Sequence, residues 1–463
     1  MRYTTLMTTA PLRSVSLLTL GCKLNQAESD AIARELTAAG CTVVDRPATA
    51  DAYIINSCSV THVADRKSRH LVRLARRLSP EATVVLTGCF PETAGMDAAL
   101  ALGADIVVPS RDKAEVVRRL LAHRPPLTTE KGNGQRAEGR GSSDAHYPLP
   151  VALPPLPFNG LRTRAFVKAQ EGCNDVCAFC IVPRTRGRER SIDPAEVAAV
   201  VRRREEEGAQ EVVITGTQLG AYGRDLDAGR YGPAAVIRAL LAETSVPRIR
   251  FSSLQPQDIT PELLALWEDP RLCRHFHLAL QSGSASVLRR MRRRYTKEQY
   301  RHALAAIRDA LPDVAITTDV LAGFPGETET EHAESVAFCR EAGFAQTHVF
   351  PYSRRPGTTA NLLPDHLPPE VKRRRLAEML DLGRAAAAAF RRRHLGRVVS
   401  VLWEQGTPAD ESGGRRWEGL TDNYIRVVTR SAEDLTNRLL PTDLTGETDD
   451  ALTGEISPIP RQL

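Results

Sequence analysis

Apolar and polar positions divide the first part of the chain into short strands and longer helices. Residues 15–20 form a short apolar run typical of a buried strand, and residues 25–39 have the spacing of a helix that Gly40 ends. Further strands are predicted at 43–44, 53–55 and 84–86, and further helices at 62–78 and 114–122. Because strands and helices alternate, the pattern predicts an α/β domain with a largely parallel sheet.

Residues 124–158 interrupt this pattern. They are rich in Pro, Gly, Ser and charge and have no apolar period, which predicts a flexible linker. Beyond them the strand–helix alternation resumes, with helices predicted at 194–207 and 328–342 among others. The strands of this second region are predicted at 165–170, 211–215, 248–252, 275–280, 315–320 and 348–351. A second α/β domain is therefore expected.

The pattern changes again near the end of the chain. Residues 368–393 carry an apolar stripe at helical spacing, which predicts one long helix. After Gly396, short alternating segments at 398–404, 416–420 and 424–429 predict strands. A small β-barrel of about sixty residues is the expected product.

Composition narrows the class of protein. The 463 residues are 42% hydrophobic and 25% charged, as in soluble globular proteins of several domains. No apolar run is long enough to span a membrane, and residues 15–20 suit a first strand better than a signal peptide. We therefore expect no membrane partner and a cytoplasmic location, where thiols stay reduced.

Basic residues suggest a polyanionic partner. The formal net charge is +6, which permits such a partner without requiring one. Arginine runs at 289–294, 373–375 and 391–393 could each be a solvated helix face. Taken together with other nucleic-acid signals, they favour RNA binding.

Three cysteines lie within eight residues, in the spacing C-x3-C-x2-C. Cys173, Cys177 and Cys180 could supply three of the four thiolates that usually hold a 4Fe–4S cluster. A missing fourth ligand would leave one iron open to bind a small molecule. The alternatives are a zinc site, which needs a fourth nearby ligand and usually has paired C-x2-C motifs, or a buried disulfide.

Three other cysteines each follow a predicted strand. Cys22, Cys58 and Cys89 fall where strands end, and in a parallel sheet all such ends lie on one edge. Any one of them could be a small buried apolar residue, but their shared position favours a second three-cysteine cluster. Cys41, Cys273 and Cys339 match no such position and are interpreted as packing residues.

The C-x3-C-x2-C motif, with Phe179 before its last cysteine, resembles the signature of radical S-adenosylmethionine (SAM) enzymes. In that family the open iron binds SAM, and an electron from the cluster cleaves it to a 5′-deoxyadenosyl radical. The segments around Cys22, Cys58 and Cys89 resemble the N-terminal domain of methylthiotransferases, where matching cysteines bind an auxiliary 4Fe–4S cluster. The resemblance implies two 4Fe–4S clusters and a central partial (β/α)6 barrel, and our mechanistic hypothesis uses SAM twice, once at each cluster.

The same resemblance implies contacts to SAM. Besides Phe179, it points to Gly216 and Gln218, in a turn that would contact the methionine portion. Gln281 and Ser282 would reach the ribose or carboxylate. Asp319 is either a polar contact or a helix cap or salt-bridge residue.

The end of the chain also resembles a known module. Residues 418–427 are similar to the TRAM domain, an RNA-binding barrel of tRNA methylthiotransferases, although a dimerisation or packing module is the alternative. The predicted units are then an N-terminal methylthiotransferase domain at 1–123, the linker at 124–158, a radical SAM domain at 159–395 and a TRAM-like domain at 396–463.

Residues 21–29, 216–223 and 291–296 most resemble the branch that acts on N6-threonylcarbamoyladenosine next to the anticodon and adds methylthio at carbon 2. The chain departs from the family in its long linker and in Gln255, where Glu is common. Expected partners are tRNA and an electron donor such as flavodoxin or ferredoxin. The alternatives are action on isopentenyl-adenosine in tRNA or on a ribosomal protein, an iron–sulfur electron-transfer protein, and an RNA-binding protein with structural zinc.

Overall fold

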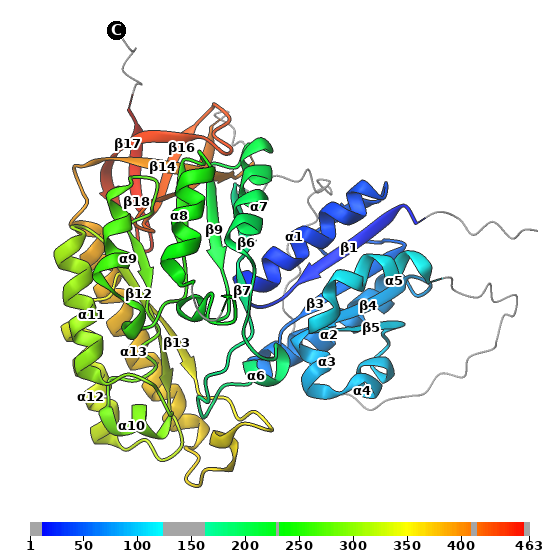
Figure 1. Cartoon of the computed structure of the whole chain (residues 1–463), viewed down its shortest axis with the longest axis horizontal. Helices are drawn as coiled ribbons and strands as arrows, with labels where there is room; N and C mark the ends of the chain where they lie inside the picture. The colour runs from blue at the N-terminus through cyan, green and yellow to red at the C-terminus, as the bar shows by residue number, and fades with distance from the viewer. Residues whose placement is uncertain (1–11, 124–162, 228–230, 409–413, 458–463) are drawn as a thin grey trace, which may run out of the picture.

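The computed structural model describes residues 12–123, 163–227, 231–408 and 414–457. Figure 1 shows an N-terminal α/β unit beside a larger central α/β unit, with a C-terminal β-barrel across one end of the central strands. The predicted linker at 124–158 lies outside the described residues. The predicted domain boundaries stay predictions.

The N-terminal sheet is parallel, in the order β2-β1-β3-β4-β5. Its strands are β1 (Ser14–Thr19), β2 (Thr42–Val44), β3 (Ala52–Ser57), β4 (Thr83–Gly88) and β5 (Ile106–Pro109). Its helices are α1 (Lys23–Ala38), α2 (His62–Leu78), α3 (Cys89–Ala94), α4 (Met96–Ala101) and α5 (Val116–Ala122). Separate apolar cores lie on the two faces of the sheet. The expected parallel α/β domain is confirmed, but β5, α3 and α4 were not predicted.

The central unit holds six parallel strands in chain order. They are β6 (Arg164–Lys168), β9 (Glu211–Thr215), β10 (Arg248–Phe251), β11 (His275–His277), β12 (Ala315–Ala322) and β13 (Gln346–Pro351). Two sheets of three strands meet through parallel bridges Ile249–Leu272 and Leu254–Leu278. This arrangement is the expected partial barrel.

Helices cover the outside of the partial barrel (Figure 1). The longer ones are α7 (Pro194–Glu206), α8 (Pro233–Glu243), α11 (Lys297–Ala310) and α12 (Glu329–Ala342). The shorter ones are α9 (Pro261–Ala265) and α10 (Ala285–Arg290), whereas α6 (Val182–Thr185) follows the C-x3-C-x2-C loop and lies against α3 of the N-terminal unit. A short antiparallel pair, β7 (Gln170–Glu171) and β8 (Arg190–Ser191), flanks the C-x3-C-x2-C loop and fixes both of its ends.

The long helix α13 (Pro369–Arg392) leads into a closed five-stranded barrel of order β14-β15-β16-β18-β17. The strands are β14 (Val398–Gly406), β15 (Arg415–Thr421), β16 (Arg426–Ser431), β17 (Leu439–Glu447) and β18 (Leu452–Ile456). The buried indoles of Trp403 and Trp417 are part of its core. The expected small β-barrel is confirmed, although β17 and β18 were not predicted.

Two arginines of β10 hold the C-terminal barrel in place. Arg248 donates hydrogen bonds to the carbonyls of Leu420 (3.0 Å) and Ser400 (2.5 Å). Arg250 donates to the carbonyl of Asp422 at 2.8 Å and forms a fully buried ion pair with Glu211, also at 2.8 Å. The guanidinium fork suits this use, because one side chain can bond several acceptors.

Several arginines of the three runs form ion pairs with carboxylates of the same chain, although most side chains of these runs are exposed. Arg290 pairs with Glu331 at 2.7 Å, and Arg375 pairs with Glu327 at 2.8 Å. Arg294 pairs with Asp175, and Arg391 and Arg392 pair with Glu447. The paired arginines therefore give less support to RNA binding than the sequence suggested. Within the described part of the chain, none of the helices combines the length and apolar character of a membrane span.

Candidate metal centres and cofactor site

Cys22, Cys58 and Cys89 follow β1, β3 and β4 at the carboxyl edge of the N-terminal sheet. Cys22 is the N-cap of α1 and is exposed, whereas Cys58 and Cys89 are buried. Burial raises the pKa of the Cys58 thiol to about 11, and the nearby thiols of Cys89 and Cys22 add to the effect. The structure thus brings the three predicted ligands to one place.

Glycines allow these loops to approach one another. Gly21 has φ +104°, and a Cβ there would lie 2.8 Å from the Cβ and 3.0 Å from the Sγ of Cys58. Gly88 has φ +94°, and its Cβ would lie 2.3 Å from the carbonyl oxygen of Ser57. Both positions therefore require glycine for conformation and for space.

Buried cations surround this cysteine edge. Glu28 of α1 binds Lys113 and accepts a hydrogen bond from Arg186 at 2.5 Å, and all three side chains are buried. Burial opposes ionisation of Glu28, but Lys113, Arg186 and Lys168 lower its pKa to about 2. Arg186 belongs to the central unit, so this network joins the two α/β units beside the first cysteine trio.

Asn25 connects this network to the cysteine loops. Its amide nitrogen donates to the carbonyls of Leu20 (2.6 Å) and Ser57 (3.0 Å), and its side-chain oxygen accepts from Arg186. The Asn25 side chain therefore links the segment before Cys22 to the segment before Cys58. Sequence reasoning missed Asn25, Glu28 and Arg186, and their only signal was their position close to the cysteine motifs.

The second trio lies on the loop after β7. Burial raises the pKa of Cys173 to about 11 and that of Cys180 to about 12. Two backbone hydrogen bonds of Ala178 fix the loop. The Ala178 N–H donates to the carbonyl of Met291 (2.9 Å), and the Ala178 carbonyl accepts from the N–H of Ala360 (2.7 Å). Phe179 packs half-buried against the apolar cluster that contains these residues.

Among the described residues, no three His, Cys, Asp or Glu side chains lie close enough to bind a single metal ion. A 4Fe–4S cluster is larger than one ion, so its ligands are more widely spaced. The donor sets fit such a cluster, because each consists of three thiols on short loops. Arg186 and Lys113 also lie close enough to Cys89 to interact with its charge, which suits a thiolate-bound centre.

The expected SAM contacts differ in how free their side chains are. A Cβ on Gly216 would lie 2.8 Å from Leu219, and the N–H of Gln218 donates to Gln170 at 3.0 Å, so this turn is tightly built. Ser282 is buried, and its hydroxyl is bonded to Ser335 of α12 at 2.9 Å. Ser282 therefore fixes a loop in this structure rather than presenting a free hydroxyl.

Gln281, beyond the end of β11, lies next to Asp319, in the middle of β12. Gln281 has φ +66°, a left-handed conformation that is costly for a residue with a side chain and is often found at functional sites. Its N–H donates to the carbonyl of Asp319 at 2.8 Å. Burial opposes ionisation of Asp319, but a hydrogen bond to His277 (3.3 Å) helps to keep its pKa below the usual value.

Gln255 and Arg293 complete the surroundings of the second trio. Arg293 donates to Cys177 Sγ and to the side-chain oxygen of Gln255, both at 3.2 Å. Gln255 in turn donates to Asp175 at 3.3 Å. The sequence had marked Gln255 as a departure and Arg293 as one of a basic run, but neither as a neighbour of the signature loop.

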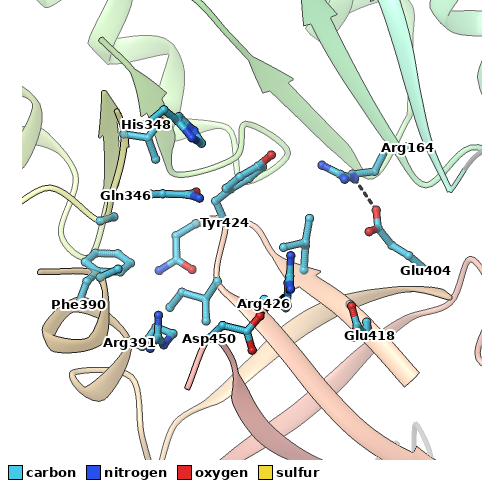
Figure 2. Close-up of a pocket in the computed structure, with 17 residues that line it drawn as sticks. Arg164, Gln346, His348, Phe390, Arg391, Glu404, Glu418, Tyr424, Arg426 and Asp450 are labelled. Carbon is cyan, nitrogen blue, oxygen red and sulfur yellow. Dashed lines mark hydrogen bonds and ion pairs between the residues drawn. The ribbon is translucent and has the colours of Figure 1, made fainter. Parts of the chain in front are cut away.

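A cavity of about 430 Å³ lies elsewhere, between the amino ends of the central strands and the C-terminal barrel. Figure 2 shows Arg164 and Glu404 paired at its edge, with Tyr424, His348 and Gln346 lining it. None of the six candidate cysteines lines this cavity. In barrels of this kind the active site forms at the opposite, carboxyl end of the strands, so we assign the cavity no part in the chemistry.

Comparison with known proteins agrees with this geometry. Residues 167–339 match the radical SAM superfamily, and residues 14–108 match the uncharacterized protein family UPF0004. The radical SAM methyltransferase TsrM from Kitasatospora setae has a similar fold, with a TM-score of 0.52 at 16% identity over 75% of this chain and 77% of that one. The fold and the superfamily match define the class of a radical SAM enzyme.

Whole-chain relatives narrow the class. The chain is 35% identical to the threonylcarbamoyladenosine tRNA methylthiotransferase MtaB of Bacillus subtilis (strain 168), over 92% of both chains. It is 33% identical to the tRNA-2-methylthio-N(6)-dimethylallyladenosine synthase of Acidothermus cellulolyticus, over 91% of this chain and 83% of that one. The chain therefore belongs to the radical SAM methylthiotransferases, a family of transferases that use SAM and 4Fe–4S clusters.

Proposed function

We propose that this enzyme adds a methylthio group to carbon 2 of N6-threonylcarbamoyladenosine next to the anticodon of tRNA. The observation that carries the proposal is the 35% identity to the Bacillus subtilis enzyme along 92% of both chains. A relative from Aquifex aeolicus with the same printed activity is 34% identical over 89% of this chain and 96% of its own.

We assign the auxiliary 4Fe–4S cluster to Cys22, Cys58 and Cys89, and the SAM-binding cluster to Cys173, Cys177 and Cys180. Once bound, the clusters and SAM would supply the methylthio group and a radical able to activate an aromatic carbon. The hydrogen on that carbon is not acidic, so general acid–base catalysis has little to act on. The protein's task is to orient the groups and exclude water.

The residues around the clusters suit that task. The buried network of Glu28, Lys113 and Arg186 would hold the auxiliary-cluster edge against the central unit. We assign the SAM site to the turn of Gly216 and Gln218 together with Phe179, Gln281 and Asp319. Ser282 would support that site through its hydrogen bond to Ser335.

Partners and location complete the proposal. The tRNA would contact a TRAM-like C-terminal domain at 396–463. The other proposed units are the N-terminal domain at 1–123, the linker at 124–158 and the radical SAM domain at 159–395. A small reductant such as flavodoxin or ferredoxin would supply the electron. Nine free cysteines suit a reducing compartment, and we propose the cytoplasm.

A second candidate substrate is tRNA that carries N6-dimethylallyladenosine. The 33% identity to the Acidothermus cellulolyticus synthase favours it almost as strongly as the first. The two substrates share the adenine carbon that would be modified and differ only in the group on N6. A methylthiotransferase acting on a ribosomal protein is a third possibility, to be separated by the same assay.

Reconstituted enzyme with SAM and reductant should be given each acceptor in turn, and the products analysed by mass spectrometry of nucleosides or peptides. We expect a mass increase of one methylthio group on threonylcarbamoyladenosine. The variant Cys58→Ala should give no product, whereas Cys41→Ala, a buried packing cysteine of the same domain, should remain active. Product only from the dimethylallyl or protein acceptor would overturn the substrate assignment, and product from Cys58→Ala would overturn the ligand assignment.

A further inference from the structure

Arg293 is held by three side chains next to the loop of the second cysteine trio. It lies in the turn between α10 and α11, and its Nη1 donates a hydrogen bond to Cys177 Sγ at 3.2 Å. Its Nη2 donates to Gln255 Oε1 and its Nε to the hydroxyl of Tyr295, both at 3.2 Å. The guanidinium also lies 4.9 Å from the centre of the Tyr295 ring.

The groups that hold Arg293 are themselves fixed. Tyr295 is buried, and its hydroxyl donates to the carbonyls of Ala279 and Leu280 at the end of the fourth central strand. Gln255 is 5% exposed, and its amide nitrogen bonds Asp175 inside the signature loop. Because both partners are anchored, the guanidinium has little freedom to turn away from the sulfur.

Arg293 differs from the neighbouring arginines in the groups that pair with its charge. Arg290 and Arg294 are each paired with a carboxylate, Glu331 and Asp175, at 2.7 Å. The contacts of Arg293 within the described part of the chain are a thiol, a phenol and a neutral amide. An arginine is always charged, so a full positive charge is directed at Cys177 without a carboxylate to balance it.

We propose that Arg293 raises the reduction potential of the cluster held by Cys173, Cys177 and Cys180, and that Gln255 and Tyr295 are positioning residues for it. The inference rests on the ligand assignment in the proposed function. Reduction adds one electron to the cluster, and a hydrogen-bond donor and positive charge at a ligand sulfur stabilise that added charge. A neutral Gln255 preserves the effect, since a carboxylate in its place would offset the charge of Arg293.

The test measures the midpoint potential of the intact, reconstituted enzyme by redox titration followed by electron paramagnetic resonance. The signal to follow is the one that changes on addition of SAM, because it belongs to the SAM-binding cluster. We expect Arg293→Gln to shift this midpoint to a more negative value, and Gln255→Glu to shift it in the same direction. Arg293→Lys keeps the positive charge but loses the branched guanidinium, so its midpoint potential should lie between those of the wild type and Arg293→Gln.

The matched control is Arg289→Gln. Arg289 belongs to the same basic run, is exposed, and would lose the same charge, so its midpoint should equal that of the wild type. A wild-type midpoint in Arg293→Gln with iron content retained would overturn the proposal. If Arg293→Gln loses iron, an unshifted midpoint in both Gln255→Glu and Arg293→Lys would overturn it instead. An enzyme in which no signal responds to SAM would contradict the proposed function, which separates the two failures.

Discussion

Single glycines decide whether the cysteine loops can meet. Gly88 is the last residue of β4, directly before Cys89, and has a left-handed φ of +94°. Its missing side chain leaves room for the backbone of Ser57 on the neighbouring strand, which precedes Cys58. The approach of two candidate ligands thus depends on the absence of one methyl group.

Gly88→Ala should therefore destabilise the N-terminal unit and reduce the iron bound by the auxiliary site. Its Cβ would lie 2.3 Å from the Ser57 oxygen, in addition to adopting an unfavourable φ. Gly40→Ala is the matched control, because its φ of +84° imposes similar strain with no atom within 4 Å. We expect Gly40→Ala to cost about 1–2 kcal/mol of unfolding free energy and to keep its iron.

Thermal unfolding and iron analysis of both variants check this expectation. Gly88→Ala should be clearly less stable than Gly40→Ala, because backbone atoms must move to remove the clash. Equal stability and equal iron content in the two variants would show that the strand ends can separate without loss.

At the scale of elements, α1 connects the two α/β units. Its first turns carry Asn25 and Glu28, which bind Arg186 beyond α6 of the central unit. An intact buried ion pair contributes little net stability, because desolvation of the two charges offsets their attraction. Removal of one partner is strongly destabilising, because it leaves an uncompensated buried charge. The position of α1 is therefore sensitive to the loss of the Glu28 carboxylate.

Glu28→Gln should cost about 3–5 kcal/mol, because Lys113 and Arg186 would keep buried positive charges without the negative charge that balances them. The pKa of Glu28 is lowered to about 2 in the folded state, so its stabilising effect is present above its unfolded value and lost as pH falls toward 2. The stability difference between wild type and variant should be constant near neutral pH and shrink below about pH 4.5. Denaturant unfolding of the iron-free proteins at several pH values measures it, and a constant difference down to pH 3 would contradict it.

The sequence predicted the elements whose signal is local. Period and length identified β9 and α2 to within one residue, because their apolar positions follow one regular pattern. It missed α3 and α4, which have only six residues each and are separated by Gly95, too short for a helical period to develop. It also missed β17 and β18, which pair with each other and are placed in the closed barrel by their outer neighbours β14 and β16.

The candidate site divides in the same way. The six cysteines could be selected from spacing and from their positions at strand ends. Arg186 and Arg293 could not, because each acts on a residue more than a hundred positions away and looks like any other arginine in the chain. For Ser282, which the motif suggested as a cofactor contact, the structure adds a hydroxyl bond to Ser335 of α12 that the sequence could not indicate.

At the scale of the whole molecule, Tyr424 lies where all three units meet. It belongs to the C-terminal barrel and has φ +67°, and its ring stacks on His275 of β11 with centroids 4.6 Å apart. Arg250 of the central unit and Lys23 of the N-terminal unit lie 5.0 and 5.9 Å from the ring centre. Lys23 directly follows Cys22, so the barrel reaches the neighbourhood of the auxiliary site.

Tyr424→Ala should loosen this junction by about 2 kcal/mol or more, because an aromatic ring is removed from between two cations and a histidine. Tyr424→Phe keeps the ring and the backbone strain and should have a small effect. Hydrogen exchange should show faster exchange in Tyr424→Ala at β14 and at the start of α1, although these segments belong to different units. The physical reason is that one side chain covers both Arg250 and Lys23, so its loss admits water to both sides of the junction. Faster exchange confined to the C-terminal barrel would mean that the barrel moves independently, and that Lys23 is held by the central unit alone.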